Sequence, residues 1–240
     1  MSNDWAIVAG ASGTIGSAIS TMLSGRGLRV LGLGRSADPS RGISSVDLTD
    51  TAAVAAITSE LDGDVQVVVH AAGSELGGGI RDVDPASVLA AMDIKVTGLL
   101  RIVRAVDPLL APSSRIIAVT GNLGYDPIPS SVGAGVANAA LGALVRQLAA
   151  EYGPRGITSH AVAPGPVESP RLERLIGHLA EAGDITSDEA RQVLLDGSSV
   201  GRFATPDDVA WAVSTLLEDG AVLSNGSTLF LDGGRRTAIP

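Results

Sequence analysis

The sequence contains no cysteine, which excludes disulfide bonds, thiol catalysis and metal sites built on thiolates. Histidine is scarce as well: His70, His160 and His178 are scattered and show no metal-ligand spacing, so we expect no metal site. Neither a signal peptide nor a hydrophobic run of membrane-spanning length is found. These absences predict a cytoplasmic protein without a metal cofactor.

Positive charge is also in short supply. The chain carries 17 Lys and Arg against 26 Asp and Glu, a formal net charge of −9, and Lys95 is its one lysine. This balance argues against nucleic acid or an anionic membrane as the main partner. Aromatic residues make up only 2% of the chain, so Ala, Val, Leu and Gly must build the core. A length of 240 residues suits one α/β domain, 1–240, acting on a small-molecule substrate.

A short apolar run followed by three glycines stands near the beginning of the chain. The run Ala6-Ile7-Val8-Ala9 is too short for a helix, and Gly10, Gly13 and Gly16 follow at equal spacing before apolar residues continue at helical spacing. Strand, glycine turn and helix in this order are typical of a dinucleotide pocket. The glycines let a pyrophosphate approach the backbone, and the helix directs unpaired N–H groups at its phosphates. A tight turn without a ligand is the alternative.

Short apolar runs alternate with helical patterns along the rest of the chain. This alternation predicts a Rossmann-like, doubly wound parallel sheet of about seven strands with helices on both faces. We expect strands near 5–9, 29–33, 43–46, 66–70, 115–119, 157–162 and 228–231. We expect helices near 14–25, 51–60, 86–110, 133–151, 170–182, 187–195 and 206–218. The charged helical segment 168–202 is either a lid over the site or a surface insertion with no gating role.

Residues after the second and third strands indicate which nucleotide would bind. An acidic residue at the end of the second strand would repel a 2′-phosphate, but the chain has Gly34 there, followed by Arg35 and Ser36. Arg35 offers a planar cation for the phosphate, which favours NADP over NAD, although a solvent-exposed loop arginine is the alternative. Asp47, after the third strand, is either an acceptor for an adenine amino group or part of the next helix cap.

Taken together, these motifs resemble the short-chain dehydrogenase/reductase family over the whole chain. The turn Gly10-Ala11-Ser12-Gly13-Thr14-Ile15-Gly16 is similar to the family's cofactor turn, and Asp47-Leu48 to its adenine contact. His70-Ala71-Ala72-Gly73 resembles its Asn-Asn-Ala-Gly element, and Pro164 to Ser169 the loop that closes over the nicotinamide. Gly201-Arg202-Phe203, Pro206 to Ala210 and Asp232-Gly233-Gly234 match its C-terminal pattern. The resemblance assigns cofactor contacts to Gly10, Ser12, Gly13, Thr14, Ile15, Gly16, Arg35, Ser36, Asp47, Leu48, Ala71, Ala72, Gly73, Pro164, Gly165, Val167 and Ser169.

The resemblance fails at the catalytic residues. The family uses an Asn-Ser-Tyr-Lys tetrad, in which tyrosine transfers the proton and lysine lowers the tyrosine pKa. In the matching register, the tetrad positions are Lys95 for asparagine, Gly121 for serine, Ala134 for tyrosine and Asn138 for lysine. No Tyr-x-x-x-Lys occurs anywhere in the chain. Asparagine and lysine are therefore interpreted as exchanged, with the family's serine and tyrosine missing.

Three residues are the candidates for catalysis under this interpretation: Lys95, Tyr125 and Asn138. Lys95 either extends its ammonium into the pocket from the opposite helix or is an ordinary lysine at the helix surface or a dimer interface. Tyr125 lies in a loop that lines the substrate pocket in the family, where it would replace the missing acid or stack on substrate. The family's long helices also pair across two-fold axes, which implies a homodimer or homotetramer.

Three functions are compatible with these residues. The first is an NADP(H)-dependent oxidoreductase that reduces C=N or C=C bonds, because a reduced ketone would need a proton at once. The second is a non-redox cyclase, isomerase or dehydratase with a vestigial cofactor, in which positioning supplies the rate. The third is a catalytically inactive partner subunit. We favour the first, with an apolar substrate of lipid, polyketide or terpenoid type from secondary metabolism.

Overall fold

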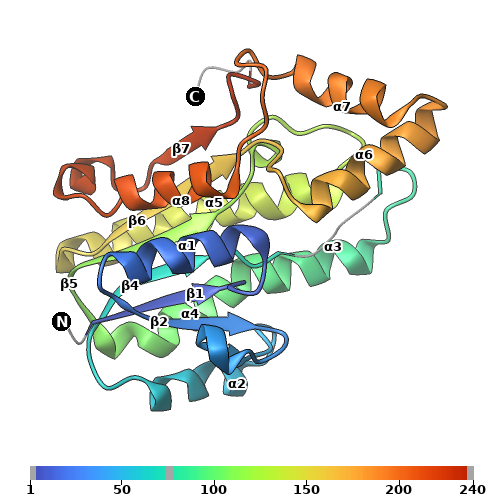
Figure 1. Ribbon diagram of the computed structural model, residues 1–240. Coiled ribbons are helices and arrows are strands. Elements are labelled where there is room, and N and C mark those ends of the chain that lie inside the picture. Colours follow the sequence, from blue (N-terminus) through green and yellow to red (C-terminus); the bar gives the residue numbers. More distant parts are fainter. Residues whose placement is uncertain (1–3, 74–77, 237–240) are drawn as a thin grey trace.

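The computed structural model describes residues 4–73 and 78–236, and it has a parallel sheet between two layers of helices (Figure 1). Its strands are β1 Trp5–Ala9, β2 Arg29–Gly34, β3 Ile43–Ser45, β4 Val65–His70, β5 Leu110–Val119, β6 Thr158–Pro164 and β7 Thr228–Leu231. Its helices are α1 Thr14–Gly25, α2 Thr51–Ala56, α3 Pro85–Met92, α4 Gly98–Val106, α5 Val132–Tyr152, α6 Pro170–Gly183, α7 Ser187–Asp196 and α8 Pro206–Thr215.

The seven strands are all parallel and lie in the order β3-β2-β1-β4-β5-β6-β7. The strand order reverses between β1 and β4, so the chain leaves these neighbours toward opposite edges of the sheet. In open α/β sheets ligands bind at such a switch point, beyond the carboxyl ends of the strands. The predicted doubly wound fold is confirmed, and it places the glycine turn at this crevice.

Two apolar cores hold the helices to the sheet. On one face α1 and α8 pack through residues such as Ile19 and Val213, and on the other α2, α4 and α5 pack through residues such as Ile102 and Leu141. Alternate residues of the buried strands supply both cores, because successive side chains of a strand point to opposite faces. The segment Val132–Arg155 is long and apolar enough to cross a membrane by composition, but its α5 part packs against β5 and β6 as a core helix.

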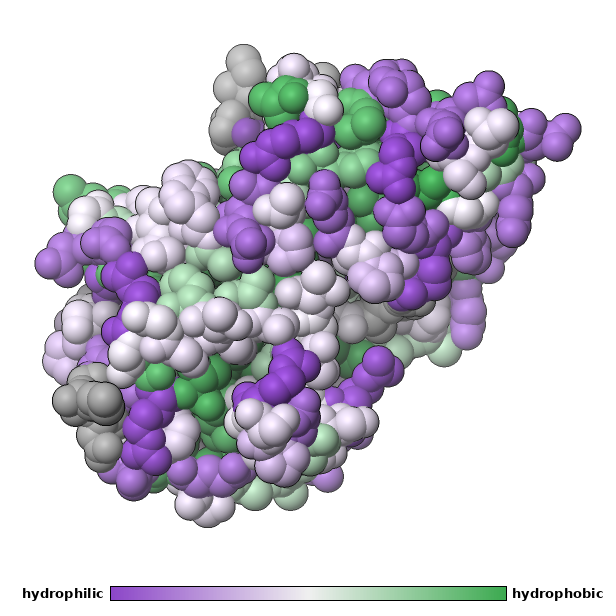
Figure 2. Space-filling model, viewed as in Figure 1, coloured by the Kyte–Doolittle hydropathy of each residue, from purple (hydrophilic) through white to green (hydrophobic). Residues whose placement is uncertain are grey.

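A third, smaller core lies in the segment 168–202 and its junction with α8. Leu172 and Ile176 of α6 pack with Ala190 of α7 and with Phe203. These two helices extend beyond the carboxyl ends of the strands, at the upper right of Figure 1. Figure 2 shows hydrophilic side chains gathered over the outer surface of this pair. The helices are confirmed, while their action as a lid stays a prediction.

The helices expected over 51–60 and 206–218 end earlier, at Ala56 and Thr215. Two other elements differ more from the sequence-based expectation. β5 starts at Leu110 rather than 115, because Leu110 already pairs with Val65 before Ser113, at φ 73°, interrupts the regular register with β4. The helix expected over 86–110 consists of α3 and α4 joined by one turn of π-helix, Asp93–Thr97, here called the π turn. π-helical turns are rare and occur frequently at functional sites. This one carries Lys95.

Candidate active site

The glycine turn fits closely against the loop after β4. Gly10 has φ 82°, in the left-handed region that favours glycine, and a Cβ there would lie 2.7 Å from the backbone nitrogen of Ala72. A Cβ on Gly16 would likewise collide with the Gly10 carbonyl. Both glycines are therefore required by backbone contact. The carboxyl ends of β1 and β4 meet here, and the turn backbone packs directly against the backbone of Ala71 and Ala72.

The first turn of α1 begins within the glycine turn. Its N-cap is Gly13, which offers no side-chain cap, and no acidic residue occupies the first turn. The N–H groups at the start of a helix have no partner inside it, and the helix dipole adds positive potential there. Ser12, Gly13 and Thr14 are exposed, and Ile15 is half-buried. The cradle therefore fits an anionic group such as the pyrophosphate of a dinucleotide.

Two arginines stand beside the glycine turn, of which the sequence indicated one. Arg35 and Ser36 are exposed directly after β2, as expected, with the Arg35 carbonyl accepting from Ser45 Oγ at 3.0 Å. Arg41 was missed: its Nη2 donates to the Ala11 carbonyl at 3.2 Å and to the Ser17 hydroxyl at 2.7 Å. The one sequence signal for Arg41 was the glycine that follows it: Gly42 has φ 64° in the turn that leads into β3. Arg35 therefore presents its charge to solvent, whereas Arg41 braces the turn itself.

Asp47 lies exposed at the end of β3. Its Oδ1 accepts from the backbone N–H of Thr49 at 2.9 Å and from the Thr49 hydroxyl at 2.7 Å. These two hydrogen bonds lower the carboxyl pKa below its usual value, so the group is ionised at neutral pH. The cap of α2 is Asp50, which accepts from the first N–H groups of that helix. Asp47 lies in the turn before this cap, where its carbonyl accepts from the N–H of Asp50, and its role as an acceptor for adenine stays a prediction.

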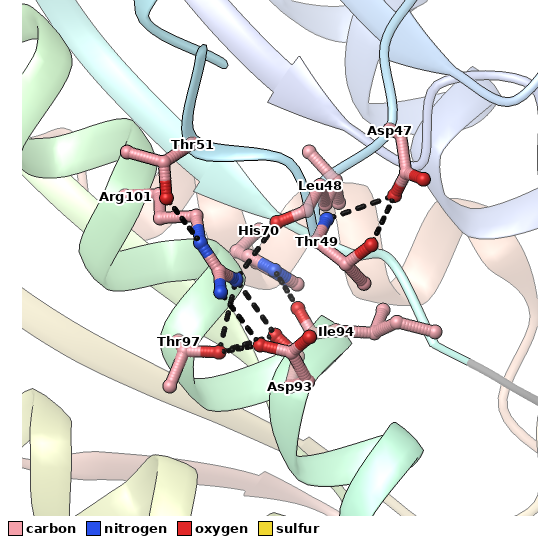
Figure 3. Close-up of polar contacts among 9 residues, drawn as sticks. All are labelled: Asp47, Leu48, Thr49, Thr51, His70, Asp93, Ile94, Thr97 and Arg101. Atoms are coloured by element: carbon pink, nitrogen blue, oxygen red, sulfur yellow. Dashed lines mark hydrogen bonds and ion pairs between the residues drawn. The ribbon is translucent and has the colours of Figure 1, made fainter. Parts of the chain in front are cut away.

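A hydrogen-bond network joins the segment after β3 to the π turn (Figure 3). Arg101 of α4 donates to the backbone carbonyl of Leu48 at 3.0 Å and pairs with Asp93 at 2.8 Å. His70, at the end of β4, donates through Nε2 to the Ile94 carbonyl at 3.0 Å. A π-helical turn disturbs the regular i→i−4 ladder, so an outside donor to one of its carbonyls helps to hold it. His70 therefore supports the turn that presents Lys95, a role the sequence did not reveal.

His70 performs this role as a neutral imidazole. Complete burial, followed by the positive charge of Lys95, lowers its pKa from 6.5 to about 4. With Nε2 as the donor, Nδ1 carries a lone pair, and among the described residues it has no hydrogen-bond partner. The ring is thus a fixed donor rather than a proton carrier at neutral pH.

The two residues interpreted as exchanged meet in the crevice. Lys95 Nζ donates to Asn138 Oδ1 at 2.5 Å and to the Thr120 carbonyl at 3.4 Å. Asn138 is 6% exposed, and the Lys95 stem passes 3.3 Å from the place where a Cβ on Gly73 would lie. The ammonium therefore lies beyond the carboxyl ends of β4 and β5, contacting α5 from the opposite helix. A role at a helix surface is incompatible with these contacts.

Both partners of the Lys95 ammonium are neutral oxygens. In the part of the chain that the structure describes, no carboxylate pairs with it. Desolvation on burial, followed by the positive charge of Arg171, lowers the pKa of Lys95 from 10.5 to about 8. Arg171 lies exposed in the first turn of α6, close enough for its charge to act on Lys95. The arrangement attracts negative charge and holds a readily transferred proton.

Gly121 and Ala134 complete the set of tetrad positions. A Cβ on Gly121 would lie 2.7 Å from Asn138 Nδ2, so the missing side chain makes room for the amide. Ala134 is half-buried one turn before Asn138 on α5 and offers a methyl group only. Positions 121 and 134 therefore place neither a hydroxyl nor a phenol beside Lys95.

Tyr125 does not join this cluster. Its hydroxyl forms a 2.9 Å hydrogen bond with the hydroxyl of Thr228, and its ring packs edge-on against Phe230, with centroids 4.9 Å apart. Thr228 is the first residue of β7, so both contacts tie the Tyr125 loop to this strand. In the described residues the Tyr125 phenol is engaged by β7 and makes no hydrogen bond to Lys95 or Asn138, so its catalytic role stays a prediction.

The loop after β6 borders the other side of the crevice. Pro164 ends the strand, Gly165 lies close to Asp232, where a Cβ would be 3.2 Å from its Cα, and Val167 bridges to Ala204. Ser169 caps α6, accepting from the N–H of Leu172 at 3.2 Å. The Ser169 hydroxyl is thus engaged in a helix cap, and it also donates to the Val167 carbonyl at 3.0 Å.

The sheet order and the crevice define a doubly wound α/β protein with its site at the carboxyl ends of the strands. The chain belongs to the short-chain dehydrogenase/reductase family of oxidoreductases: residues 10–236 match a family model described as enoyl-(acyl carrier protein) reductase. It is 35% identical to 2-(S)-hydroxypropyl-CoM dehydrogenase 3 of Xanthobacter autotrophicus, over 80% of this chain and 75% of the relative.

Two further comparisons bear on the site. Inactive 2-(S)-hydroxypropyl-CoM dehydrogenase 2 of the same organism is 34% identical, over 80% of this chain and 84% of the relative. The solved structure of an actinorhodin polyketide ketoreductase variant with NADPH superposes with a TM-score of 0.89 at 23% identity, covering 98% of each chain. At 23% identity, the likeness to the ketoreductase structure supports a shared fold and no more. The predicted family membership is confirmed.

Proposed function

We propose that the protein is an NADPH-dependent reductase of conjugated C=C bonds in which Lys95 takes the place of the family's tyrosine as proton donor. The observation that carries this proposal is the Lys95 ammonium, held by Asn138 and Thr120 beyond the end of β5. NADPH supplies a hydride when it is bound. The glycine turn and α1 would hold its pyrophosphate, and Arg35 its 2′-phosphate.

The acidity of Lys95 supports this assignment. A general acid works best when its pKa lies near the working pH. With a pKa of about 8, Lys95 is about nine-tenths protonated at pH 7, yet it releases its proton far more readily than an ordinary lysine. Its two neutral hydrogen-bond acceptors hold the ammonium in place without quenching its charge.

The same charges favour C=C over C=N reduction. Reduction of a bond conjugated to a carbonyl places negative charge on the carbonyl oxygen, which a fixed cation stabilises. A cationic C=N substrate would instead approach Lys95 and Arg171, two like charges, at a Coulomb penalty. The description of the matching family model, an enoyl reductase, supports the same direction.

Reduction of a simple enone such as 2-cyclohexenone, followed through the absorbance of NADPH, tests this proposal. We expect Lys95→Met to lose at least 100-fold in turnover while NADPH binding, measured by calorimetry, stays within a few-fold. Leu89→Met, on the exposed face of α3 and outside the site, serves as the control and retains the activity. Unchanged turnover in Lys95→Met would refute the role of Lys95.

A second candidate is a protein that binds NADPH and ligand without turnover. It rests on the relative that is named inactive and on the absent hydroxyl and phenol at 121 and 134. Tight NADPH binding without oxidation in the presence of enones, ketones and imines would favour it.

A further inference from the structure

We propose that Lys95 also captures aldehydes and ketones covalently, as a reversible imine on its side-chain amine. The inference uses the location of Lys95 in the crevice, which the function proposed above shares, but it needs neither NADPH nor reduction. The substrate class is a carbonyl compound whose carbonyl carbon can approach Nζ from the side of Gly73.

Among the described residues, no carboxylate pairs with Lys95, so no ion pair holds its amine in the charged form. An imine forms only from the neutral amine, and an ordinary lysine at pH 7 is almost entirely protonated. A carboxylate beside the ammonium would hold it in the charged form, but Asn138 Oδ1 and the Thr120 carbonyl are neutral. Neutral His70 and the cation Arg171 are the other titratable groups that act on this end of the crevice, and the charge of Arg171 opposes that of Lys95.

Access to the amine is available from one side. Lys95 is partly exposed, and exposed Gly73 presents no side chain beside the lysine Cε. Asn138, fixed on the buried face of α5, holds one N–H direction of the amine. A carbonyl compound entering past Gly73 therefore meets an oriented nucleophile.

The reaction balances without any further reagent. The Nζ lone pair attacks the carbonyl carbon and a C–N bond forms, while the C–O bond breaks. The carbonyl oxygen leaves as water with two hydrogens from the ammonium, and the remaining N–H stays on the iminium. One positive charge is present before and after, so the cation Arg171 opposes the iminium no more than it opposes the ammonium. Hydrolysis reverses the same steps.

The test is reductive trapping with butanal and cyanoborohydride at pH 7, without nicotinamide, read by intact mass and peptide mapping. Lys95 is the one lysine of the sequence, so a side-chain amine can be labelled at one position only. The α-amino group of the chain serves as an internal reference. A pKa of about 8 instead of 10.5 raises the neutral fraction of Lys95 at pH 7 about 300-fold. We therefore expect Lys95 to be alkylated at a rate comparable to the α-amino group.

Two variants control the interpretation. Asn138→Asp keeps the shape of the side chain but places a carboxylate against the ammonium, which raises the Lys95 pKa. Labelling of Lys95 should then fall at least tenfold, while labelling of the α-amino group stays constant. Lys95→Arg should be labelled at the α-amino group alone.

Two results would overturn the inference: labelling of the folded wild-type protein at the α-amino group alone, or equal labelling of Lys95 in wild type and Asn138→Asp. Its failure is separable from failure of the proposed reductase. Trapping at Lys95 without NADPH-dependent enone reduction would support the imine and refute the reductase, and the converse result would do the opposite.

Discussion

Replacing Lys95 by methionine should make the folded protein more stable at neutral pH. Methionine has a similar length and no charge, so the buried ammonium and its desolvation disappear together. A fall in pKa from 10.5 to about 8 corresponds to about 3 kcal/mol of unfavourable burial, less a discount for the partial exposure of the side chain. Loss of the hydrogen bond to Asn138 costs about 1 kcal/mol. The expected net gain is about 1–2 kcal/mol.

The pH dependence of stability distinguishes loss of the buried charge from a change in packing, because an effect of packing does not vary with the protonation of Lys95. Because the folded-state pKa of Lys95 is depressed, the unfolded chain binds more protons between pH 8 and 10.5, and the contribution of Lys95 to stability rises over that range. Below pH 8 the full penalty is present. Lys95→Met lacks this rise, so its advantage should shrink from pH 8 to pH 10.5.

Urea unfolding at pH 7 and pH 10, followed by far-UV circular dichroism, measures both effects. Leu89→Met, on the exposed face of α3, controls for the general effect of introducing methionine. A Lys95→Met protein that is less stable than wild type at pH 7, or one whose advantage is the same at both pH values, would refute the reasoning.

Three further predictions follow from the fold and the crevice. Burial lowers the pKa of His70 and of His160 to about 4, so each should reduce the free energy of unfolding by about 3 kcal/mol as the pH falls from 6.5 to 4. In urea unfolding measured across this pH range, His70→Gln should remove about half of that loss. A variant that loses as much stability as wild type would contradict the prediction. Arg35→Ala should weaken NADPH but not NADH in calorimetry, whereas Arg41→Ala, which loosens the glycine turn, should weaken both nucleotides alike; the reverse pattern would exchange their roles. Gly10→Ala should lower the free energy of unfolding by about 2 kcal/mol and abolish nucleotide binding, because its Cβ would collide with the backbone after β4. Nucleotide binding retained in this variant would contradict the assignment of the glycine turn as the nucleotide site.

Much of the fold was predictable because its signals are local. Apolar runs of four to six residues alternating with helical patterns specify buried parallel strands, and the strand boundaries near Trp5–Ala9 and Thr228–Leu231 match the prediction. The π turn was not predictable, since a single inserted residue leaves no trace in hydrophobic periodicity. The early start of β5 was hidden by the polar residues around Ser113.

The site shows a similar division. The meeting of Lys95 and Asn138 could be anticipated, because their sequence positions correspond to residues that share one pocket in the family. The packing of Tyr125 against Thr228 and Phe230 was not predicted, since proximity in sequence to Gly121 does not fix the contacts of a side chain. Arg41 depended on a turn whose geometry the sequence alone does not specify.

The close fit between Gly121 and Asn138 has an evolutionary consequence. A serine introduced at 121 alone would press its Cβ against the Asn138 amide, 2.7 Å away. A lysine introduced at 138 alone would bring a second ammonium against Lys95. Both of these single steps are therefore unfavourable while the rest of the site is unchanged. Substitutions elsewhere around Lys95 therefore meet fewer obstacles than a serine at 121 or a lysine at 138 introduced one at a time.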